Sequence, residues 1–473
     1  MGQEIPDSSF NEDAFVEFAR RLADETVLLS QWEQAGELRG DDFRLGYELE
    51  GWLVGDDAMP APDNQRFLET MADDMVVPEL ARFNFELNAK PLDFGAGMFD
   101  AMQHSLLSRW QRCQTAAQVC GLHALSIGIL PTVRRSDLTL DNISAMTRYK
   151  ALNEQVFRLR NGRPIQLKID GAEALSLQHN DVMLEAGATS LQIHLQVGSD
   201  RAVRAFNASK IASAAMVALG ANSPFLFERQ LWAETRIPLF EQAVAVGQSD
   251  YSKRVTFGIR YAENSIIECF EANRDRYPIL LPDISGSDPD PLAHLRLHNG
   301  TVWRWNRPLV GFDGPAKKPH YRIEHRVVAA GNSSVDMVAD TAFFIGLMMG
   351  LMHAEVAPET QLPFEAARDN FYQAARYGLQ AQNRWLDGHC GPLDELILQK
   401  LLPMAGEGLV SIGLHADEIS RWLSIIEQRL AVGQTGAAWQ IGWIEKYGKD
   451  WPALVQAYIE QQQKDVPVHR WSL

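Results

Sequence analysis

Four short segments of the sequence place acidic, histidine or arginine side chains at every second position. Successive side chains of a β-strand point to opposite faces, so each segment, as a strand, has one apolar and one polar face. The polar faces carry Arg44, Glu48 and Glu50; Asn84, Glu86 and Asn88; Gln192, His194 and Gln196; and Arg322, Glu324 and Arg326. Carboxylate and imidazole groups are ligands for divalent cations, and arginine suits planar anions. The pattern therefore indicates metal-dependent chemistry.

A solvated surface is the ordinary explanation for any one of these polar faces, because antiparallel sheets often leave one face in water. The four faces together favour a binding site, since none of them carries a lysine. Glu48 and Glu50 lie two residues apart, which on a strand places like charges ~6–7 Å from each other. Such a pair is destabilising unless a cation lies between the carboxylates or water hydrates them well.

Familiar loops for binding phosphate or carrying a nucleophile are missing from the sequence. The Gly448-Lys449 pair is followed by Asp450 instead of Ser or Thr, and Gly95-Ala96-Gly97 lacks the third glycine of a dinucleotide fingerprint. Neither G-x-S-x-G nor H-E-x-x-H occurs. A polyphosphate would therefore have to be held by divalent cations on carboxylates, with arginines closing over it.

The elements that must position these side chains follow from apolar periodicity. Strands are predicted at residues 43–54, 82–88, 123–130, 165–170, 189–197, 256–260, 301–306 and 320–328. Helices are predicted at 11–37, 98–120, 201–219, 336–357, 363–383, 391–402, 413–431 and 449–463. Strands without regular strand–helix alternation favour an α+β fold with an antiparallel sheet.

No internal repeat or low-complexity linker divides the chain, so we expect a single catalytic domain over residues 1–473. Within it we expect an N-terminal helical segment (1–40), a sheet-rich core (41–335) and a mostly helical C-terminal part (336–473).

Composition and charge exclude several classes of protein. The 473 residues have a formal net charge of −17, and residues 1–100 hold 7 basic and 23 acidic side chains. An acidic protein repels phosphate backbones, so we expect no nucleic-acid partner. The longest apolar stretch, residues 341–352, is shorter than the ~20 residues that cross a bilayer, so we expect a buried helix and no membrane partner. Four cysteines without C-x-x-C spacing, and an N-terminus unlike a signal peptide, predict a cytoplasmic protein with reduced thiols.

At these residues the sequence resembles the second type of glutamate–cysteine ligase, a family of ATP-dependent carboxylate–amine ligases with a glutamine-synthetase-like fold. The resemblance extends from about residue 44 to about residue 440 and depends on the order of several motifs. These are G-Y-E-L-E (46–50), the glutamate strand ending in Pro91, A-T-S-L-Q-I-H-L-Q-V (188–197), A-N-S-P-F (221–225) with Glu234-Thr235-Arg236, G-T-V-W-R-W-N-R-P (300–308), R-I-E-H-R (322–326), N-F-Y-Q-A-A-R-Y-G (370–378) and residues 433–439. The resemblance implies an antiparallel sheet with a polar, metal-binding concave face, backed by helices.

The resemblance also implies roles for particular side chains. The implied ligands of two or three Mg²⁺ or Mn²⁺ ions are Glu48, Glu50, Glu86 and Glu324. The implied contacts to ATP or substrate are His194, Arg236, Arg307, Arg322 and Arg326, with His194 also open as a further metal ligand. Arg322 and Arg326 would stabilise the transferring phosphoryl group, and Arg236 and Arg307 would meet a substrate carboxylate. Glu79 is a candidate for a further metal ligand, because Glu86 has only asparagines beside it on its strand face.

The implied reaction is amide formation through an acyl phosphate, with γ-glutamyl transfer to cysteine or a related amine as the expected case. Its partners would be small molecules, an amino-acid carboxylate and an amine; the sequence leaves a homo-oligomer open. Two alternatives also stay open: a metal-dependent hydrolase of an amide, and a non-catalytic relative that binds nucleotide. A hydrolase explains the glutamates but not the arginines beside Glu324, and the complete set of glutamates disfavours a non-catalytic protein.

Overall fold

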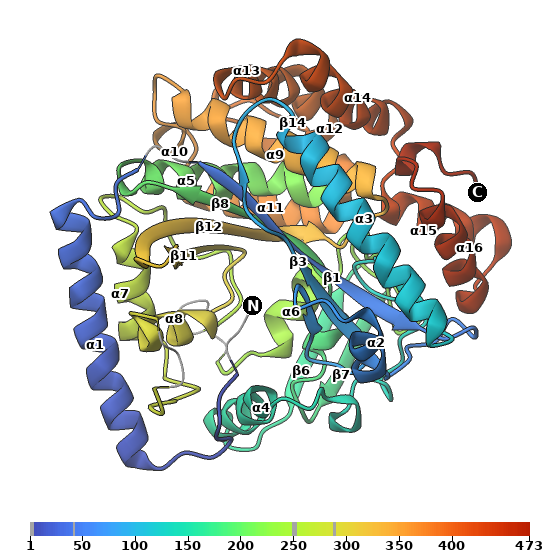
Figure 1. Cartoon of the computed structure of the whole chain (residues 1–473). Coiled ribbons are helices and arrows are strands. Elements are labelled where there is room, and N and C mark those ends of the chain that lie inside the picture. The colour runs from blue at the N-terminus through green and yellow to red at the C-terminus, as the bar shows by residue number, and fades with distance from the viewer. Residues whose placement is uncertain (1–3, 41–42, 248–252, 287–289) are drawn as a thin grey trace.

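An antiparallel sheet with helices on both sides forms the centre of the computed structural model, which describes residues 4–40, 43–247, 253–286 and 290–473 (Figure 1). The strand order is β11-β12-β8-β1-β3-β2, with β4 and β5 pairing additionally with β1. Its strands are β1 (Arg44–Val54), β2 (Val76–Pro78), β3 (Asn84–Asn88), β4 (Leu92–Asp93), β5 (His123–Leu125), β8 (Ser190–Val197), β11 (Asn306–Asp313) and β12 (Lys318–Ala329). Three small hairpins complete the β-structure: β6 (Ile165–Asp170) with β7 (Ala174–His179), β9 (Phe225–Leu226) with β10 (Arg229–Gln230), and β13 (Gln382–Arg384) with β14 (Cys390–Pro392).

The helices divide between the two faces of the sheet (Figure 1). In the first half of the chain they are α1 (Glu12–Ala35), α2 (Asn64–Met71), α3 (Met98–Val119), α4 (Thr147–Leu159), α5 (Ser199–Leu219) and α6 (Arg236–Ala243). In the second half they are α7 (Ile267–Arg276), α8 (Ala293–Gly300), α9 (Ser334–His353), α10 (Pro358–Gln361), α11 (Phe364–Tyr377), α12 (Leu393–Leu396), α13 (Leu402–Ser411), α14 (Ala416–Val432), α15 (Gly436–Tyr447) and α16 (Trp451–Gln463). Helices α3, α5, α9 and α13 lie on one side of the sheet, and α4, α6, α7 and α8 on the other.

The apolar face of the sheet packs against the first of these helical layers. Leu45, Tyr47 and Leu49 of β1 are at most 2 % exposed and belong to the same core cluster as α3, α5 and α9. Each buried leucine contributes roughly 2 kcal/mol to folding relative to an exposed one. The opposite side chains of the same strands therefore face α4, α7 and α8, and this is the side on which the sequence places its glutamates.

Helix α9 lies at the centre of the helical layer, and nearly all of its side chains, most of them apolar, are buried. With 20 residues it is long and apolar enough to cross a membrane by length and composition, but 89 % of its most apolar window is buried inside the molecule. A mostly hydrophobic helix that is buried on nearly all sides is typical of a protein core. The prediction of a buried helix is confirmed, and the helix is longer than the apolar stretch from which it was inferred.

Several predicted boundaries are wrong. Residues 256–260 form no strand, and of the strand predicted at 301–306 only residue 306 belongs to one; the two segments meet in an isolated bridge between Thr256 and Arg304. The actual strand, β11, starts at residue 306 and contains Pro308. Proline cannot donate to a ladder, but β11 is at the edge of the sheet, where one side of the strand needs no partner.

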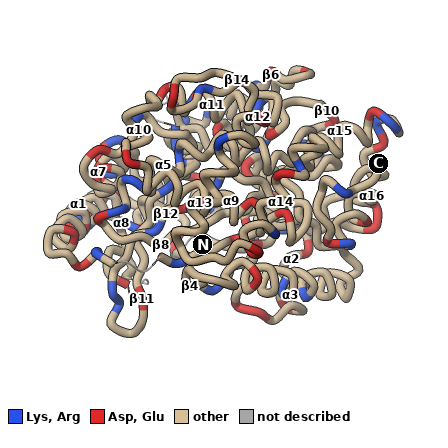
Figure 2. Tube along the Cα trace, turned by 90° about the horizontal axis from the view of Figure 1, so that it is seen from above, with Lys and Arg blue, Asp and Glu red and all other residues tan. Residues whose placement is uncertain are grey.

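Other elements differ in length from their predictions. The strand predicted at 123–130 stops at Leu125, and the helix predicted at 363–383 stops at Tyr377, before β13. Residues 391–402 contain α12 and a π-helical turn (Ile397–Leu401) that leads into α13. The α+β fold with an antiparallel sheet and a mostly helical C-terminal part is confirmed, and the single catalytic domain stays a prediction. Acidic and basic residues are interspersed along the described trace (Figure 2).

Candidate active site

The strand register brings the glutamates and the histidine of four separate segments together. Glu50 of β1 pairs directly with Glu86 of β3. His194 of β8 lies in one row with Gly46 of β1 and Glu324 of β12. Residues in register on neighbouring antiparallel strands have Cβ atoms only ~4.5–5.5 Å apart. The polar faces therefore merge into one surface in which carboxylates crowd together.

This surface is the floor of a cavity of about 230 Å³ whose walls come from α4, α7, α8 and the loops around them. The charged and titratable residues that line it include Glu48, Glu50, Glu79, Glu86, Arg148, Glu185, His194, Arg296, Arg307, Arg322, Glu324 and Arg326. Eight of the nine residues predicted for the site are among them, and so is Glu79. Figure 1 shows the walls on the opposite side of the sheet from α5 and α9.

One group of possible metal ligands consists of Glu48, His194 and Glu324, whose ligand atoms lie within 4.8 Å of one another. His194 Nε2 is 3.6 Å from Glu48 Oε1 and 3.9 Å from Glu324 Oε1. Neither ring nitrogen of His194 has a hydrogen-bond partner in the described part of the chain, although the side chain is buried. Burial lowers the pKa of His194 to about 4, so the ring is neutral at pH 7 and can ligate a metal.

A second group consists of Glu50, Glu79 and Glu86, again with ligand atoms within 4.8 Å. Burial, reinforced by Glu79, raises the pKa of Glu50 to about 7. Burial and the charge of Glu48 raise the pKa of Glu86 well above its ordinary value. Three carboxylates this close repel one another unless positive charge is added. Glu79, the additional candidate from the sequence, belongs to this group.

Both groups fit divalent cations. The second offers only carboxylate oxygens, which suit Mg²⁺ or Mn²⁺, and the first adds one imidazole nitrogen. Some of these oxygens already accept hydrogen bonds: Glu50 from Ser190 N (2.6 Å) and Gln192 Nε2 (2.8 Å), and Glu86 from Asn88 Nδ2 (2.9 Å). A carboxylate has about four lone-pair sites, so these bonds orient the oxygens and leave capacity for a cation.

Arg307 lines the cavity but is paired with a predicted metal ligand. Its Nε and Nη2 atoms donate to the two oxygens of Glu324 at 2.8 and 2.9 Å, and the two residues are in register on β11 and β12. Burial alone would raise the pKa of Glu324, but Arg307 and Arg326 hold it far below its ordinary value. Arg307 therefore keeps Glu324 ionised and oriented, and its predicted contact with a substrate carboxylate stays a prediction.

Arg322 and Arg326 also line the cavity, from β12. Arg326 Nη1 donates to Gln192 Oε1 at 3.0 Å and to Glu324 Oε2 at 3.3 Å. The Nε atoms of both arginines are buried without a hydrogen-bond partner among the described residues. Each therefore has a donor to offer an anionic ligand.

Arg236, in contrast, does not line the cavity among the described residues. Its guanidinium is 2 % exposed and donates to Glu234 Oε1 at 3.0 Å, to the carbonyl of Arg326 at 3.2 Å and to the carbonyl of Val327. The arginine thus supports the backbone of β12 beneath the site. The predicted contact of Arg236 with substrate has no support in this placement.

Sequence reasoning missed the lining residues of the walls, among them the charged residues Arg148, Glu185 and Arg296. These three lie on or beside short helices that pack over the sheet, so no alternation of residue types marks them. Burial raises the pKa of Glu185 to about 8, with Glu79 and Glu50 adding to the rise.

Comparison with known proteins identifies a family and solved structures that are similar to this chain. The family model described as glutamate-cysteine ligase family 2 (GCS2) matches residues 44–441. A comparison with curated protein sequences finds no match.

Two solved structures share the fold at low sequence identity. The glutamate–cysteine ligase of Francisella tularensis in complex with AMP has a TM-score of 0.53 at 12% identity, over 90% of this chain and 89% of its own. A bifunctional glutathione synthetase of Pasteurella multocida has a TM-score of 0.55 at 12% identity, over 92% of this chain and 54% of its own. The predicted fold, a glutamine-synthetase-like antiparallel sheet backed by helices, is confirmed.

Proposed function

The chain belongs to glutamate–cysteine ligase family 2, a family of ATP-dependent carboxylate–amine ligases, and from this we propose that it joins the γ-carboxylate of glutamate to the amine of cysteine or of a related compound. The observation that carries the proposal is the cavity itself. It is lined by two groups of possible cation ligands and by two arginines whose Nε atoms are buried without a hydrogen-bond partner among the described residues.

The chemistry explains why such a site needs this combination of charges. Forming an amide from a free carboxylate is unfavourable in water, so the carboxylate oxygen first attacks the γ-phosphorus of ATP, which releases ADP and leaves an acyl phosphate. The amine nitrogen then attacks the acyl carbon and displaces phosphate. Both steps bring anions together, and fixed positive charge must offset their repulsion.

The residues of the chain divide this work between them. Arg322 and Arg326 would neutralise the transferring phosphoryl group, for which a planar guanidinium with several donors is suited. Gln192 and Glu324 orient Arg326, since both accept hydrogen bonds from its Nη1 atom. The carboxylates of the two ligand groups would hold divalent cations, which when bound supply further positive charge at the phosphate oxygens.

The dependence of ADP release on glutamate and on an amine tests the proposal. The purified protein would be supplied with ATP, Mg²⁺ or Mn²⁺, L-glutamate and a panel of amines that contains L-cysteine, other amino acids and amines without a carboxylate. We expect ADP and phosphate to appear in equal amounts only with both glutamate and an accepted amine, together with the amide. Amide cleavage without ATP would instead support a hydrolase.

Two variants make the assay specific. Glu86→Gln removes a cavity carboxylate and should abolish ADP release. Glu69→Gln makes the same chemical change at an exposed position of α2 and should leave the rate unchanged.

A further inference from the structure

Arg148 is a buried arginine of the cavity that the chemistry above does not use. It lies in the first turn of α4, its side chain is 9 % exposed, and it lines the cavity. Its Nη2 atom donates to the hydroxyl of Tyr149 at 2.5 Å. Its Nε and Nη1 atoms are buried and have no hydrogen-bond partner among the described residues.

The surroundings of Arg148 differ from those of the phosphate-directed arginines. The carboxylates that interact with its charge are Glu79 and Glu86. Arg322 interacts instead with Glu48 and Glu324, and Arg326 with Glu324, Glu50 and Glu48. Glu79 does not pair with the free donors of Arg148: its Oε2 atom accepts from Leu80 N at 2.9 Å and from the Tyr149 hydroxyl at 3.5 Å. The cavity therefore has cationic groups at two separate places, with carboxylates between them.

Two unsatisfied donors on a buried guanidinium are costly and require an explanation. Nε and one Nη atom of arginine form a planar fork that matches the two oxygens of a carboxylate. A carboxylate suits this place better than a phosphate, since the charge of Glu79 beside Arg148 would repel a polyanion more strongly than a single carboxylate. Glu79 likewise favours a molecule that carries an ammonium group beside its carboxylate.

We propose that Arg148 binds the non-reacting α-carboxylate of an amino-acid substrate and so selects for zwitterionic substrates. The proposal rests on the proposed function, in which one substrate or both are amino acids. The glutamate donor and an amino-acid acceptor both carry an α-carboxylate, so the experiment needs one arm for each.

Calorimetric binding in the presence of Mg²⁺ and a non-hydrolysable ATP analogue tests the proposal without requiring turnover. The probes are L-glutamate and its α-amide, L-isoglutamine, for the donor, and L-cysteine and L-cysteinamide for the acceptor. We expect one of the two pairs to show roughly 10- to 100-fold weaker binding of the amide to the natural protein, the range for a charged hydrogen-bonded contact. In Arg148→Gln the same amino acid should bind as weakly as its amide, and affinity for the ATP analogue should stay unchanged.

Two further variants separate recognition from structural support. Arg148→Lys keeps the charge but loses the fork, so its affinity should lie between those of the natural protein and Arg148→Gln. Arg158→Gln changes an exposed arginine of the same helix and should alter neither amino-acid nor nucleotide binding.

The outcomes distinguish this proposal from the proposed function. If Arg148→Gln binds both amino acids as tightly as the natural protein does, or if neither amino acid is bound more tightly than its amide, Arg148 has no such role. ADP release that depends on glutamate and an amine would in those cases still support the ligase. Carboxylate-dependent binding lost in Arg148→Gln supports the proposal, and if the natural protein then forms no amide, only the ligase assignment is overturned.

Discussion

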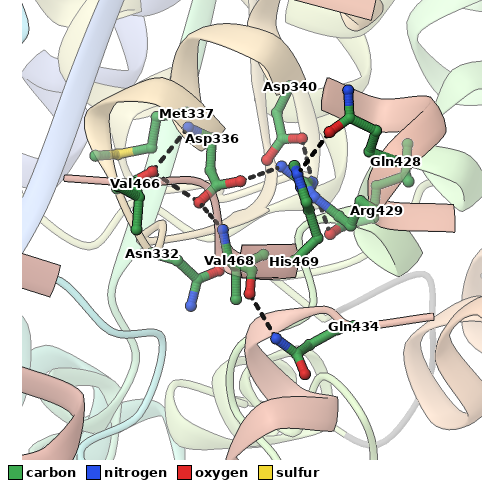
Figure 3. A network of polar contacts seen from close by, with 12 residues as sticks. Asn332, Asp336, Met337, Asp340, Gln428, Arg429, Gln434, Val466, Val468 and His469 are labelled. Carbon is green, nitrogen blue, oxygen red and sulfur yellow. Dashed lines mark hydrogen bonds and ion pairs between the residues drawn. The ribbon is translucent and has the colours of Figure 1, made fainter. Parts of the chain in front are cut away.

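Two buried clusters of charged residues in the described part of the chain differ in how their charges are matched. The first lines the cavity on the polar face of the sheet. The second, which we call the α9–α14 network, joins Asp336 and Asp340 of α9 to Arg429 of α14 (Figure 3). Arg429 donates to Asp340 Oδ1 at 2.5 Å, to Asp336 Oδ1 at 2.8 Å and to the carbonyl of Leu219 at 3.0 Å.

The α9–α14 network also forms hydrogen bonds with the C-terminal segment around Val468. Asp336 Oδ2 accepts from the hydroxyl of Ser333 at 2.7 Å and from the backbone N–H of Val468 at 2.9 Å, and Gln434 Nε2 donates to the carbonyl of Val468 at 2.7 Å. Both oxygens of Asp336 therefore have partners from within the chain. A buried charge that is paired and hydrogen-bonded in this way holds elements in place.

In the cavity, by contrast, the chain does not supply all the partners. Neither ring nitrogen of His194 is hydrogen-bonded among the described residues, and Arg148, Arg322 and Arg326 each have a buried donor without one. The pKa of Glu50 is raised to about 7 because burial and a like charge oppose its ionisation.

Unpartnered donors alone do not separate the two clusters, because the Nε atom of Arg429 is also buried without a hydrogen-bond partner among the described residues. The carboxylates do: Asp336 and Asp340 both pair with Arg429, whereas Glu50, Glu79 and Glu86 lie together without an ion pair to Lys or Arg in the described part of the chain. The comparison teaches that carboxylates paired within the chain serve the fold, whereas crowded carboxylates without such a pair mark the place where a cation supplies the missing charge.

Removing a carboxylate from the cavity should have the largest effect on activity. Glu86→Gln takes away a predicted cation ligand. The activation free energy should therefore rise by several kcal/mol, and the rate of ATP turnover should fall roughly 10³-fold or more. The melting temperature should stay unchanged or rise, because repulsion among buried carboxylates is relieved. Glu48→Gln and Glu50→Gln should also lose turnover. A strongly lowered melting temperature with retained turnover would assign Glu86 to the fold.

Breaking the α9–α14 network should lower stability and leave the binding of ATP unchanged. Arg429→Met leaves Asp336 and Asp340 buried without their cation, which should lower the free energy of unfolding by about 3–5 kcal/mol. Chemical denaturation measures this loss. Under conditions where the variant is folded, its KM for ATP should equal that of the natural protein; a selective change in KM would connect the network to the site.

Arg326→Lys tests whether the unmatched donors of the cavity act in the chemical step. The transition state concentrates negative charge at the phosphoryl group, and loss of one preorganised donor typically costs ~3–4 kcal/mol, a factor of roughly 10²–10³ in rate. Single-turnover phosphate release should show this decrease, while ATP affinity, measured separately, changes little. Full activity of Arg326→Lys would remove the main reason for preferring a ligase to a hydrolase.

Glu324→Gln should lower stability, unlike the same change at Glu48, Glu50 or Glu86. Because Glu324 forms a bidentate pair with Arg307, its neutral replacement leaves a buried guanidinium partly unpaired and should cost about 1–3 kcal/mol of stability. Melting in the presence of EDTA should therefore shift downward for Glu324→Gln and not for Glu86→Gln. Equal shifts in the same direction would show that Arg307 does not distinguish the two carboxylates.

An exposed ion pair provides the smallest effect and the baseline for the comparison. Arg421 Nη1 donates to Asp100 Oδ1 at 2.7 Å, between α14 and α3, but both side chains are about half exposed, at 52% and 53%. Water competes for both groups, so Arg421→Gln should cost less than about 1 kcal/mol. Because Arg421 and Arg429 share one helix, the difference between their variants measures the contribution of burial.

Much of the cavity floor could be predicted from the sequence, whereas its walls could not. The alternation in residues 44–50 and 322–326 correctly placed Glu48, Glu50 and Glu324 on one polar face. The failures at 256–260 and 301–306 have a common cause: alternating residues look like a strand wherever they occur, but a strand exists only where a neighbour completes its hydrogen bonds.

The sequence by itself determined which side chains share a strand face and what chemistry they offer, because side-chain alternation is a local property of an extended backbone. Only the tertiary structure decided which charges meet. Register pairs Glu50 with Glu86 and Arg307 with Glu324, folding engages Arg236 beneath β12, and α4 brings Arg148 over the sheet from a distant part of the chain. These contacts depend on strand pairing and helix packing between segments far apart in sequence, and no local pattern of residues predicts them.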